Sequence, residues 1–218
     1  RGLSFENLKD FFNIVKDINK EHYDIVVDTQ QLLKSALLLP FLNIKRKITL
    51  SGGREFSGLF SNEIVKAKHR LFAPDYHVVK RNLELAEYLG AQTDSIEFNL
   101  NLPPVEVIQR VQTLLASLDA GKKTVVISPA TTWVNKHWDE NCWRQVLVYL
   151  DGKVNLVFTG MKQDMPLIER ISSGISNTLI LAGQTNLEEL AEVFRHADVV
   201  ISPDSGSAHI AWAVETPL

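Results

Sequence analysis

The sequence predicts an α/β protein built on parallel sheets. Short β-branched runs alternate along the chain with segments whose apolar residues recur at helical spacing. Most of the strand-like runs are almost continuously apolar, as a strand buried on both faces requires. Alternation of strands and helices is typical of βαβ units with right-handed crossovers, which assemble parallel sheets.

The expected elements follow in chain order. Strands are predicted at 24–27, 47–50, 124–128, 155–159, 178–181 and 198–202. Helices are predicted at 3–21, 30–39, 76–89, 105–118, 140–150, 166–172, 187–197 and 207–214.

Paired prolines mark the expected boundary between two domains. Segment 98–104 has low periodicity and ends in Pro103 and Pro104, which is typical of a linker. The sequence therefore predicts one α/β domain at 1–102 and a second at 103–218. A parallel sheet would normally add another strand after the helix at 207–214, so we expect the second domain to be incomplete.

Composition excludes several classes of protein. The chain has 218 residues, of which 45% are hydrophobic and 22% charged, as in ordinary globular domains. A formal charge of −3 gives no general reason to expect nucleic acid as a partner. The single cysteine, Cys142, forbids an intrachain disulfide and favours a reducing compartment. No apolar run is long enough to span a bilayer.

One segment departs from the overall charge. Residues 34–81 contain ten Lys and Arg side chains against three acidic ones, interspersed with Phe, Leu, Ile and Val. A basic segment studded with apolar residues can dock against an anionic surface or substrate. The alternative interpretation is a solvated face above a core helix.

Familiar phosphate and metal motifs are absent from the sequence. There is no G-x-G dinucleotide fingerprint, no P-loop, no Cys/His cluster with zinc spacing and no Asp-x-Asp pair. A diphosphate would therefore have to be neutralised by side chains and backbone amides.

Two loops at predicted strand ends supply such groups, since ligands gather at the carboxyl ends of parallel strands. The strand at 124–128 is followed by Thr131, Thr132 and Lys136, which offer two hydroxyls and a positive charge. The strand at 198–202 is followed by 204–209, where a hydroxyl and free N–H groups open a helix and form a ready anion site.

Each of these features also has an ordinary structural interpretation. Asp204, Ser205 and Gly206 can be a helix cap and turn. His209 can be a hydrogen-bonded core histidine, and Lys136 a surface lysine. The two loops are harder to dismiss together, because they follow two strands of the same predicted sheet.

The motifs resemble those of the lipopolysaccharide heptosyltransferases of glycosyltransferase family nine. The resemblance is carried by Ala-Thr-Thr-Trp-Val-Asn-Lys-His-Trp at 130–138 and by Asp-Ser-Gly-Ser-Ala-His at 204–209. A third segment, Asp-Thr-Gln-Gln-Leu-Leu-Lys-Ser at 28–35, is similar to the family's Asp-x-Gln-Gly-Leu-x-Lys-Ser. The form of the first motif resembles the first heptosyltransferase of the pathway more than the second.

The resemblance implies a GT-B enzyme with two Rossmann-like domains. It implies an inverting, metal-independent transfer of heptose from ADP-heptose to the Kdo of a lipid A precursor, without a cofactor. It also implies a cytoplasmic protein peripheral to the inner face of the inner membrane, with no nucleic-acid partner. The basic segment 34–81 would then face the anionic acceptor.

Site roles carried over by the resemblance fall into three groups. Lys136 is expected to stabilise the departing ADP, because negative charge grows there as the glycosidic bond breaks. On the acceptor side the weaker candidates are Asp28, Gln30 and Lys34. The residues expected to bind the nucleotide-sugar are Thr131, Thr132, Lys136, Asp164, Thr185, Asp204, Ser205, Gly206 and His209.

Departures from the family pattern leave alternatives open. Asp164 stands where the family has a longer Glu that reaches the ribose, and both Asp164 and Thr185 are plausible helix caps. Gln31 replaces a family Gly, which is expected to alter the local turn.

The family's catalytic base is not identifiable in the sequence. It lies in a Gly-rich loop after the first strand, and nothing before Asp24 matches that strand, so we expect the first βαβ unit to be missing. No argument supports His22, Asp28 or Asp75 as its replacement. The remaining alternatives are another GT-B nucleotide-sugar enzyme, such as the second heptosyltransferase or an epimerase, and a non-catalytic nucleotide-binding module.

Overall fold

The computed structural model describes residues 5–68, 77–94, 100 and 102–218. The chain forms two compact units, residues 1–96 and 97–218. The predicted boundary after residue 102 stays a prediction, because residues 95–99 and 101 lie outside the described part. Asp75 also lies outside it.

The first unit carries a three-stranded parallel sheet in the order β1-β2-β3. Its strands are β1 (Ile25–Asp28), β2 (Arg46–Leu50) and β3 (Glu63–Val65). Its helices are α1 (Phe5–Lys20), α2 (Leu33–Ala36), η1 (Leu39–Phe41), η2 (Ser57–Phe60) and α3 (Val78–Tyr88), of which the η elements are 3₁₀ turns.

One prediction for this unit is wrong, and one strand of its sheet was not predicted. The helix predicted over 30–39 is wrong: the chain turns at Gln31, which has a left-handed φ of 54°, and forms only α2 and η1. A left-handed residue cannot continue a right-handed helix, and Pro40, which has no N–H to donate, prevents α2 from continuing as one helix into η1. Strand β3 is absent from the predicted strands, because its three residues are too short to show a period.

The second unit carries a four-stranded parallel sheet in the order β6-β5-β4-β7. The predicted α/β class with parallel sheets is confirmed in both units. The strands of this sheet are β4 (Thr124–Ile127), β5 (Asn155–Phe158), β6 (Thr178–Ile180) and β7 (Val199–Ile201). The helices are α4 (Val105–Leu115), η3 (Val134–Lys136), α5 (Glu140–Leu150), η4 (Lys162–Asp164), α6 (Met165–Ser172), α7 (Leu187–Arg195) and α8 (Gly206–Ala213).

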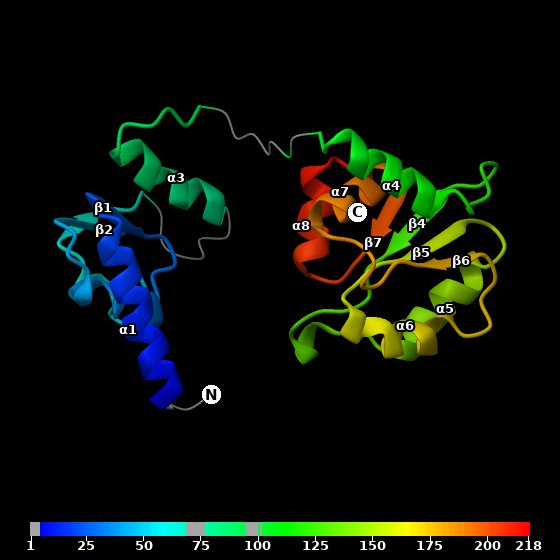
Figure 1. Ribbon diagram of the computed structural model, residues 1–218, viewed down its shortest axis with the longest axis horizontal. Coiled ribbons are helices and arrows are strands. Elements are labelled where there is room, and N and C mark those ends of the chain that lie inside the picture. The colour runs from blue at the N-terminus through cyan, green and yellow to red at the C-terminus, as the bar shows by residue number, and fades with distance from the viewer. Residues whose placement is uncertain (1–4, 69–76, 95–99, 101) are drawn as a thin grey trace. The chain divides into compact units, whose positions relative to one another are not determined.

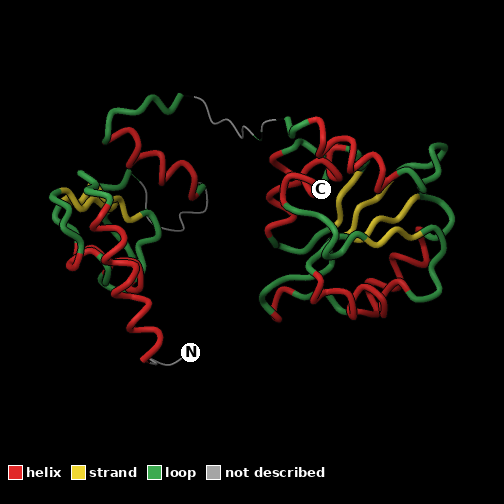
Figure 2. Tube along the Cα trace, in the orientation of Figure 1, coloured by secondary structure: helices red, strands yellow, loops and turns green. Residues whose placement is uncertain are grey.

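Helices cover both faces of this second sheet, as Figures 1 and 2 show. Alternate residues of β4 and β5 point to opposite faces, so Ile127 packs with α5 and α6 while Val126 packs with α4, α7 and α8. Trp143, Leu147 and Phe158 are fully or almost fully buried in the first of these layers. The continuous apolar runs of the sequence are therefore explained by burial on both faces.

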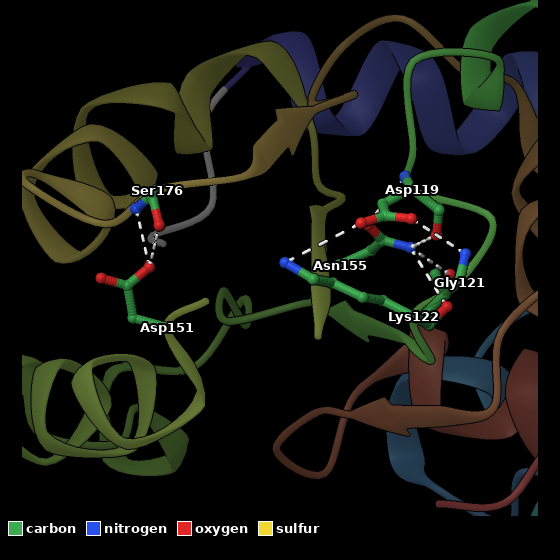
Figure 3. A network of polar contacts seen from close by, with 7 residues as sticks. Asp119, Gly121, Lys122, Asp151, Asn155 and Ser176 are labelled. Carbon is green, nitrogen blue, oxygen red and sulfur yellow. Dashed lines mark hydrogen bonds and ion pairs between the residues drawn. The ribbon is translucent and has the colours of Figure 1, made fainter. Parts of the chain in front are cut away.

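A network of polar contacts stabilises the loops at the amino-terminal edge of the same sheet (Figure 3). Asn155 begins β5 and is buried; its side-chain oxygen accepts the Asp119 N–H at 3.1 Å, and its amide donates to the carbonyls of Asp119 and Lys122 at 2.9 and 3.3 Å. Nearby, Asp151 accepts hydrogen bonds from the backbone N–H and the hydroxyl of Ser176. These contacts hold the loops at the amino-terminal edge of the sheet. The carboxyl edge, where ligands bind in parallel sheets, lies at the other end of the strands.

Candidate functional site

A cleft of about 720 Å³ opens at the carboxyl edge of the second sheet. Four loops line it, and each one follows a different strand. Their contributions to the lining lie within 128–136 after β4, 159–164 after β5, 185–190 after β6, and 204–210 after β7. All nine residues predicted to bind a nucleotide-sugar line this one cleft.

The strand order explains why the loops after β4 and β7 meet. From β4 the chain proceeds outward to β5 and β6, and then returns to place β7 on the other side of β4. In open parallel sheets the reversal of strand order leaves a crevice between the two loops, and ligands bind there.

An ion pair joins these two loops across the cleft. Lys136 Nζ donates to Asp204 Oδ2 at 2.5 Å, although 68 residues separate the two along the chain. The hydrogen bond from Lys136 lowers the pKa of Asp204, and the charge of Lys136 and then that of His209 lower it further. Both side chains keep solvent access, so the ammonium group can be reached by an anion that enters the cleft.

The helix after β7 begins at the cleft, and its N-cap side chain does not cap it. Ser205 is the N-cap of α8, but its side chain makes no capping hydrogen bond and instead contacts the Ser202 hydroxyl at 2.8 Å. Gly206 is exposed, with nothing within 4 Å of the position where a Cβ would stand. The first N–H groups of α8 are therefore available to an anion.

The loop after β4 is held by its own side chains. The Thr131 hydroxyl donates to the Trp133 carbonyl at 2.8 Å, and the Thr131 carbonyl contacts His137 Nε2 at 2.9 Å. Thr131 therefore braces the turn that leads to Lys136, whereas Thr132 is exposed in the cleft.

Asp164 and Thr185 have different local roles. Asp164 Oδ2 accepts the Met161 N–H at 2.7 Å, so one carboxylate oxygen closes the turn η4 after β5; Asp164 also stands at the N-cap of α6, but its side chain makes no capping hydrogen bond to that helix. Thr185 is not a helix cap: Asn186 caps α7 through a reciprocal pair of hydrogen bonds with Glu189. Thr185 instead lies half-buried in the cleft lining.

His209 is exposed at the cleft, which corrects the alternative of a buried core histidine. Sequence reasoning missed the exposed apolar lining of the cleft, which consists of Trp133, Met161 and Leu187. These residues lie at loops and loop ends, where no periodic pattern distinguishes them; their only signal is the position soon after a strand.

The three acceptor-side candidates lie in the other unit. Asp28 is buried, and its Oδ1 accepts the backbone N–H groups of Gln30 and Gln31, both at 3.1 Å, and the Ser35 hydroxyl at 3.0 Å. It therefore organises the turn after β1. Gln30 and Lys34 are exposed on that turn and on α2.

The described residues include no group of three or more His, Cys, Asp or Glu side chains that could hold a metal ion. Within the same described residues, no helix is long and apolar enough to cross a membrane.

Comparison with known proteins relates the chain to one family. The profile of the family described as glycosyltransferase family 9 (heptosyltransferase) matches residues 11–218. Lipopolysaccharide heptosyltransferase 3 of Escherichia coli is 28% identical over 98% of this chain and 63% of its own length. Lipopolysaccharide heptosyltransferase 1 of Escherichia coli K12 is 31% identical over 92% of this chain and 60% of its own.

A solved structure shares the fold of the chain. The structure of E. coli heptosyltransferase WaaC with ADP-2-deoxy-2-fluoro heptose has a TM-score of 0.72 and 25% identity, and the match covers 99% of this chain and 66% of that one. The chain spans about three fifths of the length of the curated relatives it matches. Relatives named heptosyltransferase 1, 2 and 3 all match, so the comparisons do not single out the first type.

Proposed function

Because the chain belongs to glycosyltransferase family 9, the heptosyltransferase family, we propose that it takes part in an inverting transfer of heptose from ADP-heptose. The proposed acceptor is the Kdo of a lipid A precursor in lipopolysaccharide core synthesis. Neither a metal nor a cofactor takes part in the proposed reaction. A lipid acceptor implies a cytoplasmic protein at the inner membrane.

One observation carries the donor half of this proposal. The loops after β4 and β7 meet in one cleft, where Lys136 and the N-terminus of α8 offer positive charge to the same space. A nucleoside diphosphate needs such charge because no metal motif is present in the sequence to supply it. The ligand bound in the WaaC structure, an analogue of an ADP-sugar, supports the same assignment.

The proposed chemistry is a displacement at the anomeric carbon. The acceptor hydroxyl oxygen forms a bond to this carbon from the face opposite to the phosphate, and the bond to the phosphate oxygen breaks with its electron pair. Negative charge then grows on the diphosphate, where the Lys136 ammonium and the amides of α8 stabilise it. The hydroxyl proton passes to a base, for which the described residues offer no assignment.

The ion pair with Asp204 positions Lys136 before a nucleotide-sugar binds. In the free protein the Asp204 carboxylate accepts a hydrogen bond from Lys136, so the ammonium group is already held at the lining of the cleft. An incoming diphosphate competes for this ammonium, and the Asp204 carboxylate is then available to hydroxyls of the sugar.

A second acceptor is also a candidate, because relatives named heptosyltransferase 1, 2 and 3 match the chain. A heptose acceptor would require the same donor site and the same displacement. Transfer assays with Kdo-terminated and heptose-terminated acceptors separate the two candidates.

The donor assignment is tested by calorimetric titration of ADP, UDP and ADP-heptose into the chain and into Lys136→Ala. We expect selective binding of the adenine nucleotides, and a loss of about tenfold or more in affinity for the variant, equivalent to about 1.4 kcal/mol. Lys123→Ala is the matched control, because Lys123 is exposed beside the amino-terminal end of β4. Equal losses in both lysine variants, or a preference for UDP, would contradict the assignment.

A further inference from the structure

A strained loop of the first unit displays an aromatic side chain to solvent. Glu55 and Phe56 are consecutive left-handed residues, with φ of 54° and 59°. This conformation is unfavourable for residues with a Cβ, so surrounding contacts must hold it. Arg54 N–H donates to the Gln31 carbonyl at 3.1 Å, and Glu55 Oε2 accepts the Leu33 N–H at 3.0 Å. The result is a Phe56 side chain that is 82% exposed.

Further apolar side chains are exposed in the same part of the unit. Phe56 directly precedes the turn η2, and Leu59, within this turn, is 78% exposed; the Leu59 N–H donates to the Phe56 carbonyl at 3.0 Å, which keeps the two residues close together. Leu33 begins α2, and Leu37, four residues later, is its C-cap with helical backbone angles; both are exposed, and α2 contacts η2. We call Leu33, Leu37, Phe56 and Leu59 the α2–η2 apolar surface.

Cationic side chains accompany this surface. Lys34, on α2, and Arg54, in the strained loop, are both exposed. Lys66 is exposed just after β3, where the Ala67 N–H donates to the Ser51 hydroxyl at 2.9 Å and so holds the segment beside the start of the loop. Lys34 and Lys66 form no ion pair with any residue that the structure describes. The acidic member of the loop, Glu55, is engaged with the Leu33 N–H.

This combination fits a lipid surface better than a protein partner. Protein interfaces are depleted in lysine, whereas bilayer surfaces favour aromatic and leucine side chains flanked by Lys and Arg, which attract anionic headgroups. We propose that the α2–η2 apolar surface inserts into the interface of an anionic bilayer, with Lys34 and Lys66 contacting its headgroups. This inference deepens the proposed function, because it assigns the surface that meets the membrane in which a lipid acceptor resides.

Vesicle sedimentation with the 218-residue chain tests the proposal. We compare vesicles of phosphatidylethanolamine and phosphatidylglycerol with vesicles of phosphatidylcholine. The test variant is Phe56→Asn with Leu59→Ser, since asparagine tolerates the left-handed backbone and preserves the loop. The control variant is Leu102→Ser with Val148→Ser, which removes two exposed apolar side chains of the other unit.

We expect the parent chain to prefer the anionic vesicles and the test variant to lose about tenfold or more in affinity, while the control variant keeps its affinity. Lys66→Gln should also weaken binding at low salt, and Lys123→Gln should not. A parent chain that binds no vesicles, or a test variant that binds as well as the control, overturns the proposal. If the double variant does not fold, Phe56→Asn and Leu59→Ser are compared singly.

Titration of ADP into the same variants separates this inference from the proposed function. The α2–η2 apolar surface includes no residue of the donor cleft, so the test variant should bind ADP like the parent chain. Loss of vesicle binding with unchanged ADP binding supports the membrane surface by itself. Failure of the parent chain to bind ADP would contradict the donor site, whereas the vesicle comparison would still decide the membrane surface.

Discussion

The ion pair across the cleft predicts the direction in which the affinity for ADP changes in the variant Asp204→Asn. In the free protein the carboxylate of Asp204 holds Lys136 Nζ at 2.5 Å, so a diphosphate must compete for the same ammonium. Asparagine keeps the size of the side chain but removes its charge. The variant should therefore bind ADP more tightly, because Lys136 is released and a negative charge beside the diphosphate is lost.

The size of the effect follows from the exposure of the pair. The side chains are 39% exposed for Lys136 and 69% for Asp204, so water screens their attraction. Exposed pairs of this kind correspond to about a two- to fivefold change in a binding constant. We expect a gain of that order for ADP at low salt, and a smaller gain as salt is added.

The affinity for ADP-heptose should change in the opposite direction. If Asp204 accepts hydrogen bonds from the sugar, as we propose, the variant loses those contacts and binds the intact donor more weakly than the parent chain does. Calorimetric titration of ADP and ADP-heptose into the parent chain and the variant measures whether the two affinities change in opposite directions. Unchanged or weaker ADP binding by Asp204→Asn would refute the competition between the carboxylate and the diphosphate.

The pH dependence provides an internal check on this experiment. The hydrogen bond from Lys136 holds the pKa of Asp204 below its ordinary value of 3.8. Because the pKa of Asp204 is lowered, the ion pair is fully present above pH 3.8 and is lost only when the pH falls through the lowered pKa. The difference between parent and variant should therefore stay constant from about pH 5 to about pH 8. A difference that disappears near neutral pH would exclude Asp204 as its source.

Two further predictions concern stability. Asn155→Ala should lower the free energy of unfolding by about 2–4 kcal/mol in urea titrations, because it leaves partly buried backbone groups of Asp119 without partners; a loss below about 1 kcal/mol would show that water replaces the amide. Arg170 lowers the pKa of Glu140 by hydrogen bonding, so this pair stabilises the fold above the ordinary Glu140 value of 4.5 and less as the pH falls below it. Glu140→Gln should therefore show a smaller acid-induced loss of stability than the parent chain, and an identical loss would contradict the assignment.

Much of the second unit could be predicted from sequence because its signals are local. The strands at 124–128, 155–159 and 198–202 are largely apolar, and each forms within a residue or two of its prediction. The helix expected at 207–214 is α8. Strand ends in a parallel sheet share one edge, so the loops of the site could be predicted to lie near each other before their contacts were known.

Local signals failed where the tertiary structure decides the backbone. The segment 30–39 has helical periodicity, but Gln31 turns the chain out of the helix, and contacts with distant residues accompany this turn: the Gln31 carbonyl accepts the Arg54 N–H at 3.1 Å and its side-chain oxygen accepts a hydrogen bond from Arg81 at 2.9 Å. Strand β3 exists because β2 offers it a parallel partner, with Ile48 opposite Glu63, and not because of its own three residues. A pattern reports the preference of a segment, whereas these outcomes depend on hydrogen bonds to other parts of the chain.

The sequence by itself determined the α/β class, the family and nine of the residues that line the cleft of the second unit. Only the tertiary structure decided how those residues are paired. It showed that Lys136 is held by Asp204, that Asp164 closes its own turn and that Asn186 caps α7 in place of Thr185. The physical reason is distance along the chain: periodicity and spacing describe neighbours, whereas an ion pair across 68 residues forms only after the sheet has brought its loops together.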